Sequence, residues 1–149
     1  MIRATLFLLG AAIAADAVAD GASTHFNRAK EVARSTLGID FGPRMAYIPQ
    51  QVLETGDAEH AIGSLCKLVA KALDTAKSEV DNFAIASVDD DAQMRLLECI
   101  DRALGNTQLP SLRLVFVGGR HRELAARAIV EAWGATFYFA PDPDRAGVQ

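Results

Sequence analysis

The order of strand-like and helix-like segments between residues 57 and 140 constrains the fold of this chain more than any other feature. Apolar runs typical of buried strands lie at residues 83–88, 112–117 and 136–140. The segments before and between these runs repeat apolar side chains at helical spacing. Parallel strands are joined by helical crossovers and are covered on both faces, so this alternation indicates an α/β fold. We predict a small three-layer domain with a mostly parallel sheet of three or four strands.

The first nineteen residues have the pattern of an export signal. Arg3 precedes an uncharged apolar run at residues 4–15, and the Ala-Val-Ala sequence at residues 17–19 is typical of a signal-peptidase site. Asp16 interrupts the run, which is shorter than the roughly 20 residues of a membrane-spanning helix. We predict a signal peptide at residues 1–19 and a periplasmic or secreted mature protein that is not membrane-embedded. The alternative is a cytoplasmic protein whose first strand lies at residues 5–9.

The remaining residues, 20–149, suffice for a single domain with one hydrophobic core. Residues 57–140 are expected to form its parallel core, and residues 141–149 a frayed tail. Residues 39–56 are the least regular part, because glycines and prolines interrupt every pattern there. A connection of this length is sometimes a functional loop, and a short strand at residues 45–48 is the alternative.

Charge and composition exclude several classes of partner. The chain has 15 basic and 19 acidic residues, with a net charge of −4. A mildly acidic domain with scattered lysine and arginine lacks the basic patch that nucleic acids and anionic membranes require. We therefore expect neither a nucleic acid nor a membrane surface as partner.

The two cysteines, Cys66 and Cys99, fall on consecutive predicted helices. Consecutive right-handed crossovers place such helices side by side, so a disulfide is possible. An oxidising compartment favours the bond, whereas in the cytosol both residues would be ordinary core thiols. Cys66 lies near the centre of its apolar stripe, and Cys99 lies about 100° from the centre of its own. We predict a Cys66–Cys99 disulfide on this basis.

Polar residues follow all three predicted core strands. Ligands of open α/β sheets bind beyond the carboxyl ends of the strands, so this edge is the expected place for a site. The best candidate is an anion-binding turn made of Gly118, Gly119, Arg120, His121 and Arg122. Two glycines allow close backbone approach, and the following helix offers unpaired N–H groups. The turn lacks the spacing of a phosphate-binding loop, and the alternative is an ordinary turn with solvated basic side chains.

Recognisable catalytic and metal-binding motifs are missing from the sequence. The three histidines lie in separate segments without metal-ligand spacing, and no nucleophile motif is present. The aspartates at residues 89–91 are typical of a helix cap, and they lack the spacing of a calcium loop. We predict no catalytic residue, no metal and no cofactor.

The sequence therefore favours an exported, non-catalytic protein that binds a protein partner or assists assembly in the cell envelope. The alternative is a small enzyme or ligand-binding domain that uses the turn at residues 118–122 to bind a phosphate or carboxylate.

Overall fold

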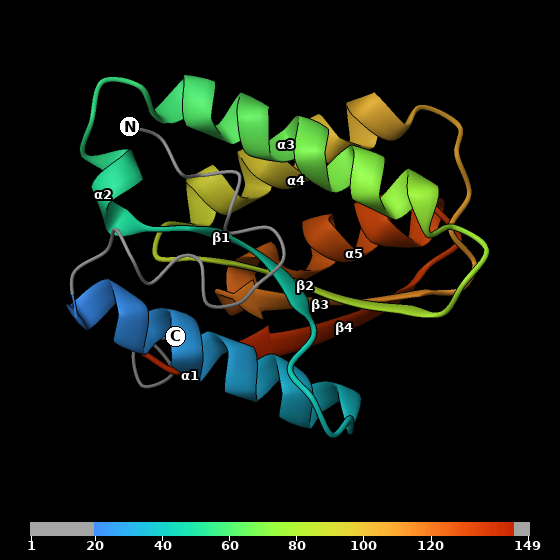
Figure 1. Cartoon of the computed structure of the whole chain (residues 1–149), viewed down its shortest axis with the longest axis horizontal. Coiled ribbons are helices and arrows are strands. Elements are labelled where there is room, and N and C mark those ends of the chain that lie inside the picture. The colour runs from blue at the N-terminus through green and yellow to red at the C-terminus, as the bar shows by residue number, and fades with distance from the viewer. Residues whose placement is uncertain (1–19, 145–149) are drawn as a thin grey trace.

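The computed structural model describes residues 20–144, and the predicted signal peptide lies outside them (Figure 1). The elements in chain order are α1 (Asp20–Leu37), β1 (Arg44–Ile48), α2 (Gln50–Leu53), α3 (Ala58–Thr75), β2 (Asp81–Ser87), α4 (Asp90–Leu104), β3 (Leu112–Gly118), the 3₁₀ helix η3 (Arg120–Arg122), α5 (Glu123–Ala132) and β4 (Thr136–Pro141).

The four strands form one all-parallel sheet in the order β1-β2-β3-β4. In β2, Ile85 lies opposite Ala46 of β1 on one side and Phe116 of β3 on the other. Both β2 and β3 are buried along nearly their whole length, as expected for strands covered on both faces. The predicted α/β fold with a parallel sheet is confirmed.

Helices cover the sheet in two layers of unequal size. Figure 1 shows α3 and α4 on one side of the sheet and α1 on the other. Helix α5 packs against β3 and β4 and contacts α4. Alternate residues of each strand face the two layers. Phe83 and Ile85 belong to the core under α3, α4 and α5, whereas Ala84 and Ala86 pack toward α1. The small side chains facing α1 allow that helix to lie close to the sheet.

The segment that the sequence leaves irregular contains β1 and the short helix α2. All four residues from Met45 to Ile48 are buried, so this strand has no alternation of polar and apolar residues that would mark it. Pro49 directly after the strand is the N-cap of α2. The structure therefore contains the alternative short strand, and the irregular parts of this segment lie between α1 and β1 and after α2.

Cys66 of α3 and Cys99 of α4 are joined by a disulfide bond, with an S–S distance of 2.18 Å and a Cα–Cα distance of 6.0 Å. The two helices pack side by side, which brings the sulfur atoms together. Cys66 is buried in the core, whereas Cys99 is partly exposed. This difference agrees with the off-centre position of Cys99 on its helix.

The ends of the elements follow from local hydrogen bonding. The Asp89 carboxylate caps α4 by accepting the N–H groups of Asp91 at 2.8 Å and Ala92 at 3.2 Å, as expected of a helix cap. The tail is not frayed at its start, because Pro141 belongs to β4 and Asp142 is buried. Among the helices of residues 20–144, none combines the length and the apolar character needed to span a membrane.

Candidate functional site

The carboxyl ends of β2, β3 and β4 lie at one edge of the sheet, as the parallel fold requires. The polar residues at this edge contact one another. The backbone N–H of Asp142, just after β4, donates to the carbonyl oxygen of Gly118 at the end of β3, at 3.1 Å. Buried Ser87 ends β2, and its hydroxyl donates to the carbonyl oxygen of Ile48 at 3.2 Å. The carboxyl ends of the strands therefore lie together as predicted, and hydrogen bonds join them.

The predicted anion-binding turn faces two carboxylates at the start of α4. The Gly119 N–H donates to Asp90 Oδ1 at 3.2 Å, and His121 Nε2 lies 3.5 Å from Asp90 Oδ2. Arg122 forms an ion pair with Asp91. A carboxylate of the chain itself thus lies where an external anion would bind. Anion binding by this turn stays a prediction, and it requires that Asp90 be displaced.

Gln93 is buried between β2 and β3 just behind this turn. Its Nε2 donates to the carbonyl oxygens of Ile85 at 2.8 Å and Val117 at 2.9 Å, which links the ends of the two strands. Its Oε1 has no hydrogen-bond partner within the described part of the chain. Gln93 was not among the site residues predicted from the sequence. A usable signal existed, because Gln93 is a polar residue on the same helix face as the apolar Leu96, Leu97 and Ile100.

A second polar cluster at this edge joins three segments that are far apart in the sequence. His25 of α1 contacts the Tyr47 hydroxyl through Nδ1 at 2.6 Å. Its Nε2 lies 3.1 Å from both carboxylate oxygens of Asp142. The three residues are 4%, 1% and 1% exposed, respectively. This cluster fastens α1 and the residue after β4 to the edge strand β1.

The contacts of this cluster extend outward to the surface. The Asp144 N–H donates to Asp142 Oδ1 at 2.9 Å, and Arg28 Nε and Nη2 donate to the Asp144 carboxylate at 2.7 and 2.9 Å. Arg28 lowers the pKa of Asp144. Burial, followed by the nearby Asp142 carboxylate, raises the pKa of Tyr47 far above its ordinary value, so the phenol is neutral at physiological pH.

A chain of tyrosine, histidine and aspartate can transfer a proton only when a substrate reaches one of its ends. Here neither end of the cluster is accessible, because Tyr47 and Asp142 are both almost completely buried. The arrangement therefore holds the fold together. Nor do the residues from 20 to 144 contain a group of three or more histidine, cysteine, aspartate or glutamate side chains that could hold a metal ion.

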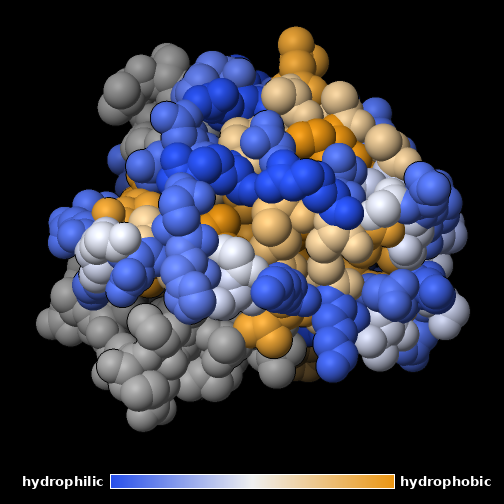
Figure 2. Space-filling model, turned by 90° about the horizontal axis from the view of Figure 1, so that it is seen from above, coloured by the Kyte–Doolittle hydropathy of each residue, from blue (hydrophilic) through white to orange (hydrophobic). Residues whose placement is uncertain are grey.

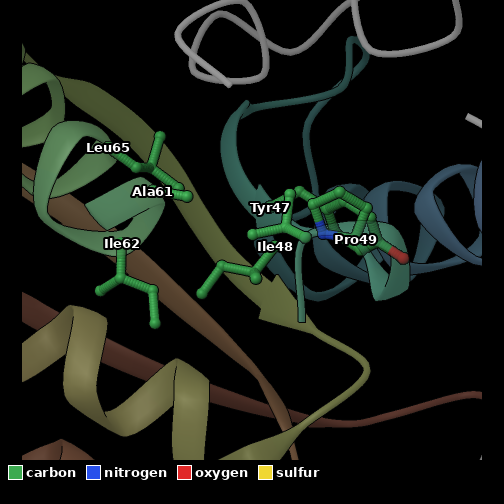
Figure 3. Close-up of a pocket in the computed structure, with 7 residues that line it drawn as sticks. Tyr47, Ile48, Pro49, Ala61, Ile62 and Leu65 are labelled. Atoms are coloured by element: carbon green, nitrogen blue, oxygen red, sulfur yellow. The ribbon is translucent and has the colours of Figure 1, made fainter. Parts of the chain in front are cut away.

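A small apolar cavity lies next to this cluster, at the end of β1 (Figure 3). Figure 3 shows Ile48 and Ile62 beside it, with the Tyr47 side chain directed toward α1. The cavity has a volume of about 10 Å³, which is room for roughly one water molecule. Its apolar lining offers a water no partner beyond the backbone, so we assign no ligand to it.

The opposite end of the sheet has a different surface. A groove runs between the loop that joins α1 to β1 and the start of β2. The described chain exposes three large hydrophobic side chains, Phe41 (83%), Val80 (73%) and Leu124 (80%). Two of them, Phe41 and Val80, line this one groove. Figure 2 shows that apolar side chains also gather on the helical face, among charged ones. Single exposed apolar side chains are normal, whereas large contiguous apolar patches are typical of interaction sites.

The loop that carries Phe41 is held firmly by α1. Gly38 ends the helix with a φ of 68°, and Arg34 Nη1 donates to the carbonyl oxygen of Ile39 at 2.7 Å. The Lys30 side chain packs so closely against Gly42 that a side chain at residue 42 would overlap with it. Phe41 is exposed on this loop, so part of the segment predicted to be irregular contributes to the surface.

Comparison with protein-family models, with curated proteins and with solved structures finds no match for this chain. Its function is therefore inferred from its own residues.

Proposed function

We propose that this chain is an exported, non-catalytic protein that binds another protein of the cell envelope. The observation that carries the proposal is the groove between Phe41 and Val80, where two large apolar side chains are held in solvent. Burial of such side chains against a partner is favourable by about 25 cal/mol per Å² of apolar area. Aromatic side chains on rigid loops are also common anchors of protein interfaces.

The state of the two cysteines supports export. The Cys66–Cys99 disulfide suits an oxidising compartment, where such bonds form and persist. The absence of a free cysteine in the chain agrees with this assignment.

The geometry of the other edge of the sheet favours binding over catalysis. The polar groups there contact one another: His25 contacts Asp142, and Asp90 contacts Gly119. An enzyme of this fold class would instead present such groups to a substrate at this edge. The groove with exposed Phe41 and Val80, which also has polar lining residues, lies at the opposite end of the strands.

Photo-crosslinking in the native envelope tests this proposal. A photoreactive amino acid in place of Phe41 should crosslink the exported protein to a second envelope protein. The matched control places the same group at Leu124, which is equally exposed but lies on α5, outside the groove. Equal crosslinking at the two positions, or a folded cytosolic protein that retains Met1, would contradict the proposal.

A further inference from the structure

The two edge strands of the sheet, β1 and β4, differ in exposure. β1 is buried at residues 45–48, whereas the two end residues of β4 are exposed and its central Tyr138 and Phe139 are partly exposed. β4 pairs with β3 through six consecutive residues, and within residues 20–144 it has no strand partner on its other side. Charged side chains and bulges usually keep an edge strand from pairing with another chain. β4 has neither, because its sequence is Thr-Phe-Tyr-Phe-Ala-Pro and its register with β3 is unbroken.

One hydrogen bond fixes which backbone groups of β4 face outward. The N–H of Asp142 donates to the carbonyl oxygen of Gly118 in β3. Backbone groups alternate in direction along a strand, so those of the other even-numbered residues of β4 face β3 as well. The N–H and C=O groups of Phe137 and Phe139 therefore face away from the sheet. Pro141 occupies the next outward position and has no N–H, so the open stretch ends there.

We propose that β4 pairs with β4 of a second copy of this chain, antiparallel across a two-fold axis at Tyr138, and joins the two four-stranded sheets into one. In this register Phe137 lies opposite Phe139 of the partner subunit, and Phe139 lies opposite Phe137 of the partner subunit. Each of these pairs exchanges two backbone hydrogen bonds, as in any antiparallel ladder. The edge thus complements itself, as a two-fold interface requires.

The side chains of β4 favour a second copy over an unrelated strand. Phe137 and Phe139 lie on the face of the sheet that packs against α5, and Tyr138 lies on the face that packs against α1. The proposed register therefore places two phenylalanine pairs on one face and a tyrosine pair on the other. Aromatic cross-strand pairs of this kind stabilise a sheet. An unrelated strand could share the hydrogen bonds, whereas a copy of β4 also supplies these aromatic side chains by symmetry.

Helix α5 leaves room for a second copy beside β4. It packs over β3 and β4, about one strand spacing from the proposed axis, so the two copies of α5 lie about 10 Å apart, close to the separation of packed helices. The guanidinium groups of Arg120 and Arg127 lie 5.1 and 4.8 Å from the phenylalanine rings of β4. Both arginines pair with Glu123, and Arg127 also pairs with Glu131. The charges beside the edge are therefore balanced, and they do not oppose the approach of a second copy.

This contact lies apart from the groove that carries the proposed function. The groove is lined by residues of β1, of β2 and of the segments that precede them, whereas β4 is the opposite edge of the sheet. A dimer through β4 leaves both grooves accessible, so each inference can fail without the other.

A cysteine at the proposed axis tests the register in the full chain. Tyr138→Cys places two thiols at a non-hydrogen-bonded pair, whose Cα atoms are about 4.5 Å apart in an antiparallel sheet, within the range of a disulfide. We expect oxidation to give a covalent dimer on a non-reducing gel. The control, Thr136→Cys, lies on the same strand and is exposed, but its copy is about 14 Å away along the strands, so it should stay monomeric. Equal dimer yields at the two positions, or no dimer from Tyr138→Cys, would overturn the proposal.

Sedimentation equilibrium measures the dimer without an added cysteine. Phe139→Pro removes an outward N–H and leaves the ladder to β3 intact, as Pro141 does at the next outward position. The dissociation constant of the dimer should be about ten-fold or more higher for Phe139→Pro than for Phe139→Ala, which loses the ring alone. Phe41→Ala in the groove should leave the dimer unchanged.

Three results of this measurement contradict the proposal: a monomeric wild type at every concentration, equal dissociation constants for the two variants of Phe139, or a dimer that Phe41→Ala abolishes. If Phe139→Pro does not fold, the comparison of Tyr138→Cys with Thr136→Cys decides alone.

Discussion

The two ends of the sheet differ in how their side chains find partners. At the carboxyl end, His25, Tyr47 and Asp142 are buried and bonded to one another. At the amino end, Phe41 and Val80 are exposed and line one groove. The end at which an α/β fold usually binds its ligand is closed by internal contacts. The end that is usually structural carries the open surface.

The order of the strands explains why the carboxyl end has no open crevice. Ligand crevices of open α/β sheets form where the strand order reverses, because neighbouring helices there lie on opposite faces. In the described sheet the order β1-β2-β3-β4 never reverses, and α3, α4 and α5 share one face. No crevice of this kind arises between them, so polar residues at the carboxyl end have room to pair with each other. Fold class alone would therefore direct attention to the carboxyl end, where these polar residues contact one another.

The largest expected effect comes from breaking the buried cluster. His25→Ala removes the contacts of His25 with Tyr47 and with the buried Asp142 carboxylate, and we expect the free energy of unfolding to fall by about 3–5 kcal/mol. Urea denaturation monitored by circular dichroism measures this change. Arg28→Ala, which removes an exposed ion pair with Asp144, is the control and should cost much less, because solvent screens the pair. Equal losses from the two variants would show that burial of the cluster contributes little.

Loss of the disulfide should have the next largest effect. We expect it to lower the free energy of unfolding and to leave the groove unchanged. Removing it by Cys66→Ala together with Cys99→Ala should destabilise the fold by about 3–4 kcal/mol, because the bond constrains a long loop in the unfolded chain. Crosslinking from position 41 should persist in the double variant, since α3 and α4 lie away from the loop between α1 and β1. A loss of the crosslink in a variant that is still folded would connect the two regions.

A smaller effect, with a distinct pH dependence, is expected for the Tyr47 hydroxyl. Tyr47→Phe removes its contact with His25 and should cost about 1–3 kcal/mol near pH 7. The pKa of Tyr47 is raised in the fold, so its contribution is fully present below the unfolded value, about 10, and is lost as the pH rises beyond it. Denaturation between pH 7 and 11 should show a steeper alkaline loss for the wild type than for Tyr47→Phe. Parallel curves would assign the alkaline loss to other groups.

Local sequence patterns predict much of the sheet and of the helical layer. Residues 112–117 form a strand because a continuous apolar run bounded by turns has few other solutions. The Cys66–Cys99 bond follows from the parallel order, which places α3 beside α4. β1 could be predicted only as an alternative, because its four buried residues, which lie between two prolines, show no polar–apolar alternation.

The polar cluster could not be predicted, because its members are held together only by the tertiary structure. His25 and Asp142 are 117 positions apart, and no local spacing marks either of them. The groove is an intermediate case. The irregular composition of residues 39–56 indicated a loop of interest, but its position beside Val80 depends on how β1 and β2 pair in the sheet.

The smallest expected effect concerns the turn at residues 118–122, and it decides whether the carboxyl end is closed to anions as well. Because Asp90 already accepts the N–H of Gly119, phosphate should not shift the melting temperature of the wild type beyond the general effect of salt. Asp90→Ala vacates this position, and a phosphate titration should then stabilise the variant, by about 2.7 kcal/mol at 100 times the dissociation constant. Arg120→Ala in the same background tests whether the neighbouring guanidinium contributes to the site. Stabilisation of the wild type by phosphate, abolished by Arg120→Ala, would instead favour the ligand-binding alternative and would mean that Asp90 yields to an external anion.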